Sequence, residues 1–498
     1  MPPKPYILAV DIGSSAVKAG LYDAEANALS HTLVSVGHQQ RTATDGTHEE
    51  DAEEIQRATE SAIDGALRAA GDDADQIAAV GLDAMASTIL GVDVRHDPVT
   101  PVFTYADTRT ARDVDALQAS IDVDGAYQRT GVMQHTSYVP GRVNWMRRTD
   151  PEAFARITKW TDISTFIFTR WFGSTDVPAS YSVSAWSGLL NRHELDWDAG
   201  LLDAIGLEPS NMPGLAPYSE GQSGLCPIYS MRWPQLVDVP FYLAVGDGAA
   251  VNIGSGCTNR RNIALTVGTT AAMRLVVDHP GDESPPVVPK GLWGYILRGD
   301  RTLLGGAFSE GGNVVEWALK SLNLPPLDRL NDALADTVPD AHGLTVLPFI
   351  AGERAVGWST NASGVVNGVR VSTSGLDILQ ALMESVAYRF SLVAGLLRDE
   401  MDNDRVFIAG GGSVTNSPWW LQTMADVLQG EVHVPSEEQA TSRGAGILAL
   451  NALGVWEGLD DVMPEIAAVY EPRDEYRSVY EEAIERQSEL YEAVIARD

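Results

Sequence analysis

The chain has 498 residues, 44% of them apolar, which is enough for more than one hydrophobic core, so two domains of similar size are expected. Its 68 acidic and 35 basic residues give a net charge of −33, which argues against nucleic acid or an anionic membrane as a partner. With no apolar leader, no apolar run of about 18 residues and only two cysteines, the sequence predicts a soluble cytoplasmic protein without a disulfide framework.

The first predicted element is a β-hairpin. Residues 7–10 are an apolar run, residues 11–15 favour a turn, and residues 16–22 alternate apolar and other side chains. A helical pattern over residues 49–70 and a buried strand that ends at Asp83 come next. The chain therefore mixes helices and strands from its beginning, which indicates an α/β fold.

A second strand, turn and strand occupies residues 263–277 and is a diverged echo of the first hairpin. No short repeat of the solenoid type accompanies it, so the echo indicates two related lobes. The small and polar stretch 254–262 is the predicted boundary. We therefore expect one domain over residues 1–254 and a second over residues 255–498.

The second half carries the pattern of a nucleotide site. A helical apolar stripe covers residues 376–390, and a strand over residues 406–409 runs into three glycines. Asn416 or Ser417 can cap the helix that follows, with Pro418 at its first position. The charged tail, residues 474–498, is typical of a surface helix.

Three turns combine glycine with serine or threonine. They are Gly13-Ser14-Ser15, Gly268-Thr269-Thr270 and Gly410-Gly411-Gly412-Ser413. Such turns let backbone N–H groups and hydroxyls converge on phosphate because no bulky side chain intervenes. Each one alone is also typical of an ordinary chain reversal.

Two aspartates stand beside such turns. Asp11 ends the first apolar run, where a carboxylate can hold Mg²⁺ while the ion bridges phosphate oxygens. Asp247 lies between two glycines just before a run of small residues that can start a helix, so it can accept a proton. Turn capping is the alternative for both, and Lys18 is equally consistent with a plain surface charge.

The combination of these motifs resembles the FGGY family of carbohydrate kinases. The matching segments are Asp11-x-Gly13, Gly246-Asp247-Gly248, Thr266 to Thr270 and Gly410 to Asn416, in the family's order and over nearly the whole chain. Residues 347–354 and 439–446 also look like family segments. The resemblance implies two ribonuclease-H-like lobes, as in actin-like ATPases, with sugar mostly on the first lobe, ATP mostly on the second, and a cleft between them.

The resemblance also implies a role for each matching position. Asp247 would be the catalytic base, and Asp11 and Asp247 would be the residues associated with Mg²⁺. Ser413 stands where many members have alanine. The positions implied to contact ATP or its phosphates are Gly13, Ser14, Ser15, Lys18, Gly268, Thr269, Gly312, Gly412, Ser413 and Asn416.

The acceptor is less well defined. Met85 and Ala86 fall where members commonly have a Met-His element, and Asp107 and Arg109 match a sugar-contacting element whose tryptophan is replaced here. The residues from 130 to 142, with His135 and Arg142, resemble the gluconate kinase branch. An arginine can grip a carboxylate through two hydrogen bonds, which suits a sugar acid. We therefore expect Arg142, or alternatively Arg109, to hold the carboxylate of gluconate.

Several alternatives stay open. Xylulose or another ketose or polyol is the alternative acceptor within the family. An actin-like ATPase that switches without phosphorylating a sugar is the alternative from another class of protein. The acidic excess fits either a solvated surface or adaptation to high salt, and the oligomeric state, a homodimer included, is not fixed by the sequence.

Overall fold

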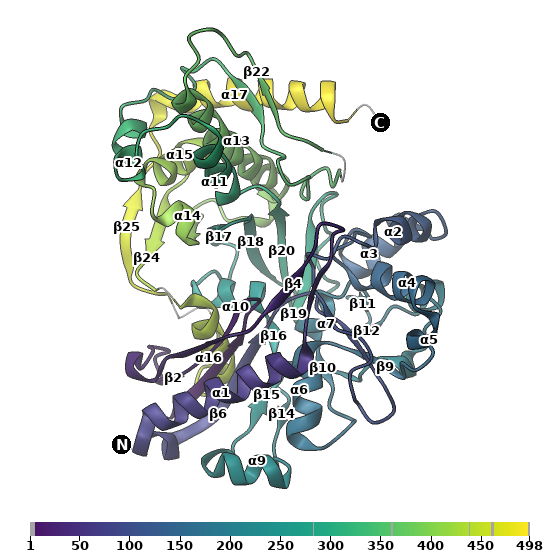
Figure 1. Cartoon of the computed structure of the whole chain (residues 1–498). Coiled ribbons are helices and arrows are strands. Elements are labelled where there is room, and N and C mark those ends of the chain that lie inside the picture. The colour runs from purple at the N-terminus through teal and green to yellow at the C-terminus, as the bar shows by residue number, and fades with distance from the viewer. Residues whose placement is uncertain (1–4, 282, 360–361, 438, 460–462, 497–498) are drawn as a thin grey trace.

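The computed structural model describes residues 5–281, 283–359, 362–437, 439–459 and 463–496. Figure 1 shows two lobes, one formed mostly by the first half of the chain and one mostly by the second half. Each lobe is built around a seven-stranded sheet. This is the mixed α/β architecture that the sequence predicted.

The sheet of the first lobe contains the predicted hairpin. Strands β1 and β2 pair antiparallel with Asp11 opposite Lys18, and β1 pairs parallel with β6 so that Asp11 lies opposite Asp83. In sheet order the strands are β14 (Gly221–Gln222), β15 (Phe241–Tyr242), β6 (Ile77–Ala84), β1 (Tyr6–Ile12), β2 (Ala16–Tyr22) and β3 (Val34–Gly37), with β16 (Val245–Gly246) also beside β6.

Alternation along β1 gives this sheet two different faces. Leu8, Val10 and Ile12 share a core with helix α1 (Ala52–Ala70), which begins at the side-chain cap Asp51. Ala9 packs on the other side with Ala445 of helix α16 (Ala440–Ala452). Asp11 belongs to this second face because it lies two residues after Ala9.

The sheet of the second lobe contains the echo of that hairpin. Strands β17 and β18 pair antiparallel, and β17 pairs parallel with β23, as β1 does with β6. In sheet order the strands are β19 (Trp293–Arg298), β20 (Arg301–Phe308), β18 (Ala271–Asp278), β17 (Asn262–Val267), β23 (Val406–Gly410), β24 (Val432–Pro435) and β25 (Ile466–Tyr470).

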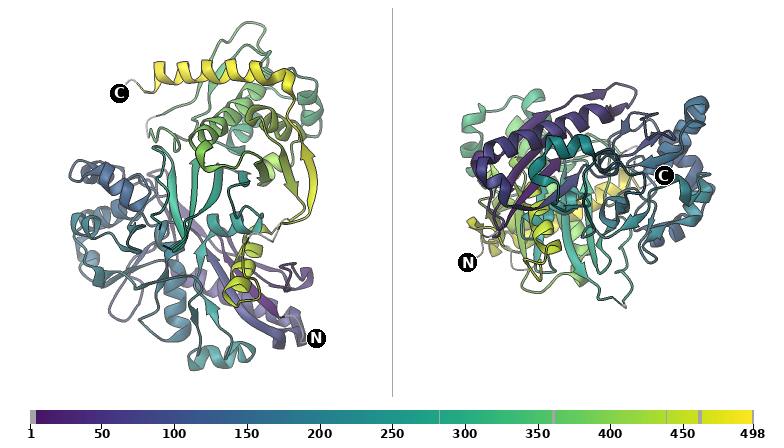
Figure 2. Two further views of the ribbon diagram at one scale, coloured as in Figure 1. Left: turned by 180° about the vertical axis from the view of Figure 1, so that it is seen from behind. Right: turned by 90° about the horizontal axis from the view of Figure 1, so that it is seen from below.

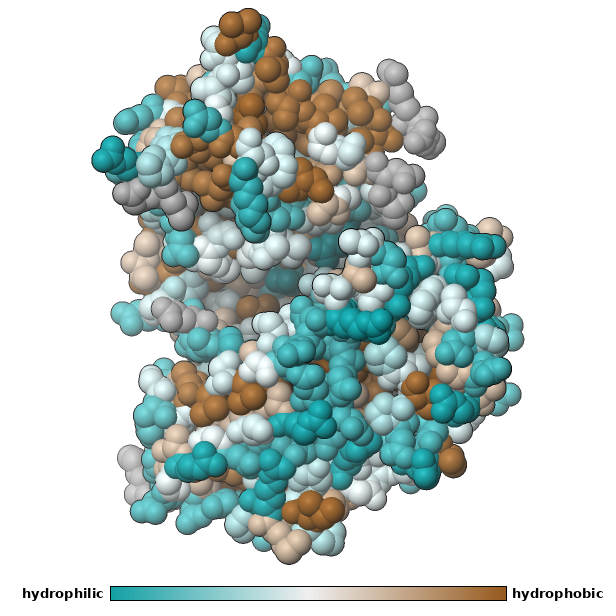
Figure 3. Space-filling model, viewed as in Figure 1, coloured by the Kyte–Doolittle hydropathy of each residue, from teal (hydrophilic) through white to brown (hydrophobic). Residues whose placement is uncertain are grey.

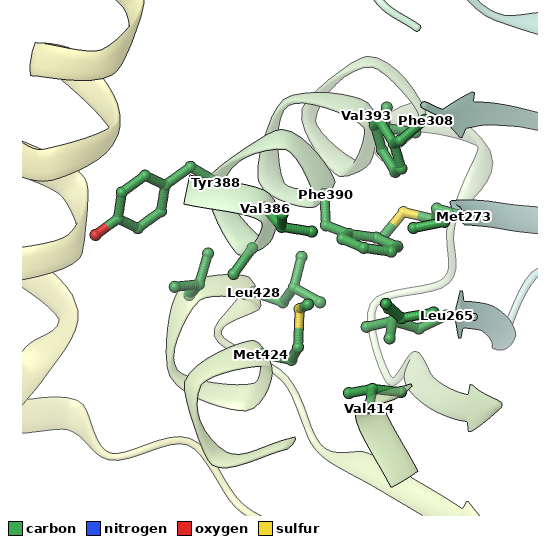
Figure 4. Packing of buried hydrophobic residues seen from close by; sticks show 14 of the residues in the cluster. Leu265, Met273, Phe308, Val386, Tyr388, Phe390, Val393, Val414, Met424 and Leu428 are labelled. Carbon is green, nitrogen blue, oxygen red and sulfur yellow. The ribbon is translucent and has the colours of Figure 1, made fainter. Parts of the chain in front are cut away.

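Two predicted helices cover one face of this second sheet. Helix α13 (Gly375–Leu396) begins with a capping box in which Ser374 and Asp377 exchange hydrogen bonds, and α15 (Pro418–Leu428) begins at Ser417. Figure 4 shows Phe390 of α13 and Met424 of α15 among the buried side chains beside the strands. The helical stripe at residues 376–390 was therefore a correct indication of a core-facing helix.

Helix α16 comes late in the chain but packs on the first lobe. It contacts β1, β6 and helix α10 (Asp247–Gly254). A Cβ added to Gly254 would lie 1.7 Å from the carbonyl oxygen of Ala440, and one added to Gly444 would lie 1.9 Å from that of Ala250. Glycine is required at both places because the two helix backbones touch. The two lobes are thus joined by this helix crossing as well as by the chain between Gly254 and Asn262, and a division at residue 254 alone does not describe the joint.

The remaining elements surround the two sheets. Helix α17 lies at the end of the second lobe far from α16 (Figure 2) and corresponds to the predicted surface helix, whose last two residues fall outside the described part. In the first lobe these elements are β4 (Gln40–Thr42), β5 (His48–Glu50), β7 (Leu90–Val92), β8 (Val102–Phe103), α2 (Ala111–Gln118), α3 (Val123–Thr130), α4 (Val139–Thr149), α5 (Pro151–Phe154), β9 (Lys159–Thr161), α6 (Ile163–Phe172), β10 (Ala179–Ser180), α7 (Tyr181–Ala185), β11 (Leu190–Asn191), β12 (Asp196–Trp197), α8 (Ala199–Ala204), β13 (Leu215–Ala216) and α9 (Pro227–Arg232). In the second lobe they are α11 (Gly312–Ser321), α12 (Leu327–Ala335), β21 (Thr345–Leu347), β22 (Val365–Asn367), α14 (Gly412–Thr415) and α17 (Arg477–Val494).

Within the described residues, no helix combines the length and the apolar character needed to span a bilayer. Both cysteines are free thiols. Cys257 is buried, whereas Cys226 is only partly buried.

Candidate active site

A cavity of about 550 Å³ opens between the two lobes, and the surface in Figure 3 is hollowed there. Both lobes contribute to its walls. The predicted site residues that line it are Ser14, Met85, Ala86, Asp247, Gly268 and Thr269. The fold therefore brings together six positions that are as far apart in sequence as residues 14 and 269.

Asp247 is the first residue of helix α10 and lies on the wall of this cavity. Its Oδ1 accepts hydrogen bonds from the N–H groups of Gly248 (2.7 Å) and Ala86 (3.3 Å). Burial raises the pKa of this carboxyl to about 6, and the nearby Asp11 adds to the rise against those two hydrogen bonds. The carboxylate can thus exchange a proton close to neutral pH.

The glycines on either side of Asp247 make room for Trp186. A Cβ on Gly246 would lie 2.5 Å from the indole Nε1, and one on Gly248 would lie 2.7 Å from the indole ring. The indole of Trp186 stacks on Tyr295 with 3.8 Å between ring centroids, and Tyr295 stacks on Trp293 at 4.5 Å. This aromatic wall spans the two lobes and holds the loop of Asp247 in place.

Asp11 and Asp83 form a pair of carboxyl groups behind Asp247. Asp83 is completely buried, and neither of its oxygens has a hydrogen-bond partner among the described residues. Burial and the adjacent Asp11 raise the pKa of Asp83 well above its ordinary value, and burial also raises the pKa of Asp11. Unpartnered carboxylate oxygens of this kind fit the ligand preference of Mg²⁺. Lys18, the register partner of Asp11, donates to Gln439 Oε1 at 3.3 Å.

The glycine turns of the second lobe are packed backbone against backbone. The carbonyl of Gly268 accepts hydrogen bonds from the N–H of Gly312 (2.7 Å) and the hydroxyl of Ser413 (3.1 Å). A Cβ on Gly312 would lie 2.7 Å from that same carbonyl oxygen, and Gly411 has a φ of +87°. The close packing leaves no room for a side chain at Gly312, so backbone groups and the Ser413 hydroxyl form this junction, a composition suited to phosphate.

A second cavity of about 330 Å³ begins at this junction. Thr269 lines both cavities, so they lie on either side of the same turn. Among the predicted nucleotide residues, Gly312, Ser413 and Asn416 line it, and Gly412 lies beside it with its carbonyl bonded to the Asn416 amide at 2.8 Å. The inner walls come from α11, α12, α13 and α15 and include apolar side chains, as a nucleotide base requires.

In the first lobe, Gly13 and Ser15 belong to the turn that also contains Ser14, between β1 and β2. Only Ser14 reaches the wall of the first cavity. The carbonyl oxygen of Gly13 lies 2.9 Å from Nε2 of the His38 ring. This hydrogen bond anchors the turn to the residue that directly follows β3.

Arg142 is not placed as the sequence predicted. It is fully buried and is absent from the cavity wall, and its guanidinium donates to the carbonyls of Ser87, Thr136 and Ser137. Burial lowers its pKa to about 9. Arg142 therefore ties two wall segments together and is occupied by backbone oxygens. A buried arginine and an exposed one look alike in a sequence.

His135, Asp107 and Arg109 also lie outside the wall of the first cavity. The His135 ring packs edge-on against Trp358 at 5.1 Å, and burial lowers its pKa to about 4, so it is neutral. Arg109 is paired with Asp107 and with Glu49. Asp107 and Arg109 thus form an ion pair within the first lobe and do not face the cavity.

Two arginines of the first cavity were not predicted from the sequence. Arg274 of β18 and Arg354, in the loop after β21, both line it from the second lobe. Arg354 belongs to the segment 347–354, which resembles a family segment. Its place in the sequence gave no indication that its side chain lines this cavity. Asp83 and the aromatic wall were missed too, because only strand pairing brings them to the site.

Comparison with known proteins gives matches over nearly the whole chain. Residues 6–254 match the N-terminal domain of the FGGY family of carbohydrate kinases, and residues 263–453 match its C-terminal domain. A gluconokinase of Bacillus subtilis is 27% identical over 478 residues, which cover 93% of this chain and 91% of that one.

Two solved structures from Lactobacillus acidophilus have the same fold. A gluconate kinase and a ligand-bound xylulose kinase each superpose with a TM-score of 0.91 at 24% identity. Each match covers 99% of both chains.

Proposed function

The chain belongs to the FGGY family of carbohydrate kinases, and on that premise we propose that it transfers the γ-phosphoryl group of ATP to a hydroxyl of gluconate or a closely related sugar acid. The observation that carries this proposal is the position of Asp247. Its carboxylate lies on the first-lobe wall of a cavity whose second-lobe wall contains the turn Gly268 to Thr270. A proton acceptor and a phosphate cradle thus face the same space.

Asp247 is the proposed general base. Its Oδ1 is held by two backbone N–H groups, and no described residue donates to Oδ2. Oδ2 can therefore receive the proton of the acceptor hydroxyl as the oxygen attacks phosphorus. A pKa of about 6 leaves most of this carboxyl ionised at pH 7, while the rise makes it a stronger base than an ordinary aspartate.

The two cavities that share Thr269 would divide the substrates between them. The smaller one, with Gly312 and Asn416 in its wall, would hold the nucleoside, and the shared residue Thr269 would lie where the phosphate chain passes into the larger one. Asp11 and Asp83 would be the residues that hold Mg²⁺. The ion would supply positive charge to the β- and γ-phosphates in phosphoryl transfer.

Gluconate is preferred over xylulose as the acceptor for two reasons. The Bacillus subtilis protein that is 27% identical to this chain is a gluconokinase. The cavity also has two arginines on its second-lobe wall. The overall negative charge of the chain would repel an anionic acceptor, and the two arginines would offset that repulsion inside the cavity. A neutral ketose would not need them.

The test is ADP release from ATP with gluconate, xylulose, ribulose, glycerol or no added acceptor. We expect turnover that depends on the acceptor, with the highest kcat/KM for gluconate. Preference for a ketose or polyol would replace gluconate as the acceptor within the same family. ADP release that no acceptor changes would instead favour an ATPase switch and overturn the proposal.

A further inference from the structure

Two positive charges face the first cavity without a carboxylate partner. Arg274 donates from Nη1 to the hydroxyl of Thr266 at 3.3 Å, and its buried Nε has no hydrogen-bond partner. Arg354 donates from Nη2 to the carbonyl of Phe308 at 2.6 Å. Neither guanidinium takes part in an ion pair with any residue that the structure describes.

These two partly buried side chains differ from Arg389, a buried arginine of the same lobe. Arg389 is paired with Glu353 and lies 3.6 Å from Glu310. Burial lowers the pKa of Arg274, the charge of Asp247 partly offsets this, and the charge of Arg354 lowers the pKa again. Two neighbouring cations with unused donors are costly unless an anion joins them. The ligand of this cavity should therefore bring a negative group to these two side chains.

Strand register places Arg274 toward the acceptor end of the cavity. It lies opposite Gly305, which in turn lies opposite Trp293 of the aromatic wall. Its guanidinium reaches back along the hairpin to the hydroxyl of Thr266 and interacts electrostatically with Asp247, so it lies on the side of the cavity that the proposed base also faces. The anion at Arg274 is thus more naturally part of the acceptor than part of the nucleotide.

We propose that Arg274 and Arg354 form a carboxylate-binding subsite that selects a sugar acid over the neutral polyol of the same carbon chain. This inference rests on the proposed function and assigns the second lobe a direct part in choosing the acceptor. The aromatic rings of Trp186, Trp293 and Tyr295 would cover the carbon chain between this subsite and Asp247. The carboxylate of one acceptor molecule would then contact the lobe opposite the base, so a sugar acid bridges the cavity.

The experiment compares D-gluconate with D-glucitol, in which a CH₂OH group replaces the carboxylate. The variants are Arg274→Gln, Arg354→Gln and, as a matched control, Arg298→Gln. Arg298 lies on β19 of the same sheet, is paired with Asp300 and does not line the cavity, so its removal changes the net charge equally. Calorimetric binding of each compound accompanies the kinetic assay, because it reports on the subsite even without turnover.

We expect wild type to favour gluconate, and we expect Arg274→Gln to lower kcat/KM for gluconate by about 10- to 100-fold, the size of one or two lost charge-assisted hydrogen bonds. The value for glucitol should change by less than about 3-fold, since no charge is involved. The KM for ATP, measured with glucitol, should stay constant. Arg298→Gln should behave as wild type with both acceptors.

Stability separates a binding role from a structural one. Because Arg274 is a partly buried cation that takes part in no ion pair among the described residues, the ligand-free Arg274→Gln protein should melt at the same temperature as wild type or higher, and it should lose the rise caused by gluconate. A lower melting temperature without ligand, or equal losses on both acceptors, would overturn the subsite. A raised KM for ATP would assign the arginines to phosphate instead.

Failure of the proposed function would look different. If no acceptor were phosphorylated while gluconate bound in a manner that depends on Arg274, the kinase assignment would fall and the subsite would stand. If gluconate did not bind, or bound no better than glucitol, the subsite would be wrong even in an active kinase.

Discussion

The hairpins of the two lobes have the same build and different chemistry. In the first, Asp11 stands two residues before the glycine of the turn, and in the second Thr266 stands two residues before Gly268. Each hairpin also pairs its first strand in parallel with a later strand of the same sheet. The shared geometry places a turn of each hairpin near the cavity. The side chain two residues before the glycine, Asp11 or Thr266, determines whether that hairpin offers a carboxylate or a hydroxyl.

The difference extends to the surroundings of each hairpin. Asp83 and Asp247 lie near Asp11, so carboxylates gather on the first lobe. Arg274 lies on the strand next to Thr266, and Arg354 faces the same cavity, so cations gather on the second lobe. One lobe is equipped to hold a cation and accept a proton, and the other is equipped to hold anions. The first-lobe side of the cavity is therefore negatively charged, and the second-lobe side is positively charged.

The largest expected effect comes from removing the base of the first lobe. Asp247→Asn keeps the size of the side chain but cannot accept a proton, so kcat should fall by about 10²-fold or more. ATP binding should change little, because the nucleotide residues lie on the other lobe. The measurements are steady-state turnover with gluconate and calorimetric titration of ATP. Near-normal turnover of the variant would remove Asp247 from the mechanism.

A matched pair of substitutions tests the two hairpins directly. Asp11→Asn should raise the Mg²⁺ concentration needed for half-maximal activity by about 10-fold or more, since a metal-associated carboxylate is lost. Thr266→Val, at the equivalent position of the second hairpin, should leave that Mg²⁺ dependence as it is. Binding of Mn²⁺ in the presence of ATP, followed by electron paramagnetic resonance, gives a second readout. An equal change in both variants would mean that the hairpins do not differ in metal binding.

The sequence predicted those parts of the site that local patterns encode. The two hairpins, the stripe of α13 and the helix that starts at Pro418 were predicted correctly, because alternation, helical spacing and capping act over a few residues. The turn at Gly268 and the Gly-Asp-Gly element of Asp247 were recognisable for the same reason. Their meeting at one cavity followed from the family resemblance.

The sequence could not predict what depends on pairing between distant strands. Arg274 reaches the aromatic wall only through its register with Gly305 and Trp293. Arg142 was chosen as the cation for the acceptor because its segment resembles one branch of the family, yet its side chain is used by three carbonyls. Burial and partner choice are properties of the fold, so residue type and spacing do not reveal them.

The dependence on pH sharpens the assignment of Asp247. Its pKa is raised to about 6, so the base is protonated and inactive below that pH. We expect kcat/KM for gluconate to rise about tenfold per pH unit up to about pH 6 and then to level off. If kcat/KM levelled off already near pH 3.8, the ordinary pKa of an aspartate, the result would contradict the environment described for this carboxyl.

Stability should respond to the same group in the opposite direction. A carboxyl whose pKa is higher in the folded protein binds its proton more tightly there, so folding loses stability as the pH rises from 3.8 to about 6. The ligand-free Asp247→Asn protein lacks this loss. Its melting temperature should therefore exceed that of wild type above pH 6 and approach it near pH 4.

The smallest expected effect concerns a property in which the two lobes are alike. Residues 1–254 contain 34 acidic and 17 basic residues, and residues 255–498 contain 34 and 18, so the negative charge is divided evenly. Like charges repel at low ionic strength, and the screening length falls to about 10 Å at 0.1 M salt. Added KCl should thus raise the melting temperature of both lobes together, by a few degrees for about 1 kcal/mol of relieved repulsion. Calorimetry between low salt and molar KCl measures this shift. A flat or falling melting temperature would remove the case for adaptation to salt. If two unfolding transitions were seen and salt raised the temperature of only one, the repulsion would destabilise one lobe more than the other. Ion pairs on the less affected lobe would then already offset the repulsion there.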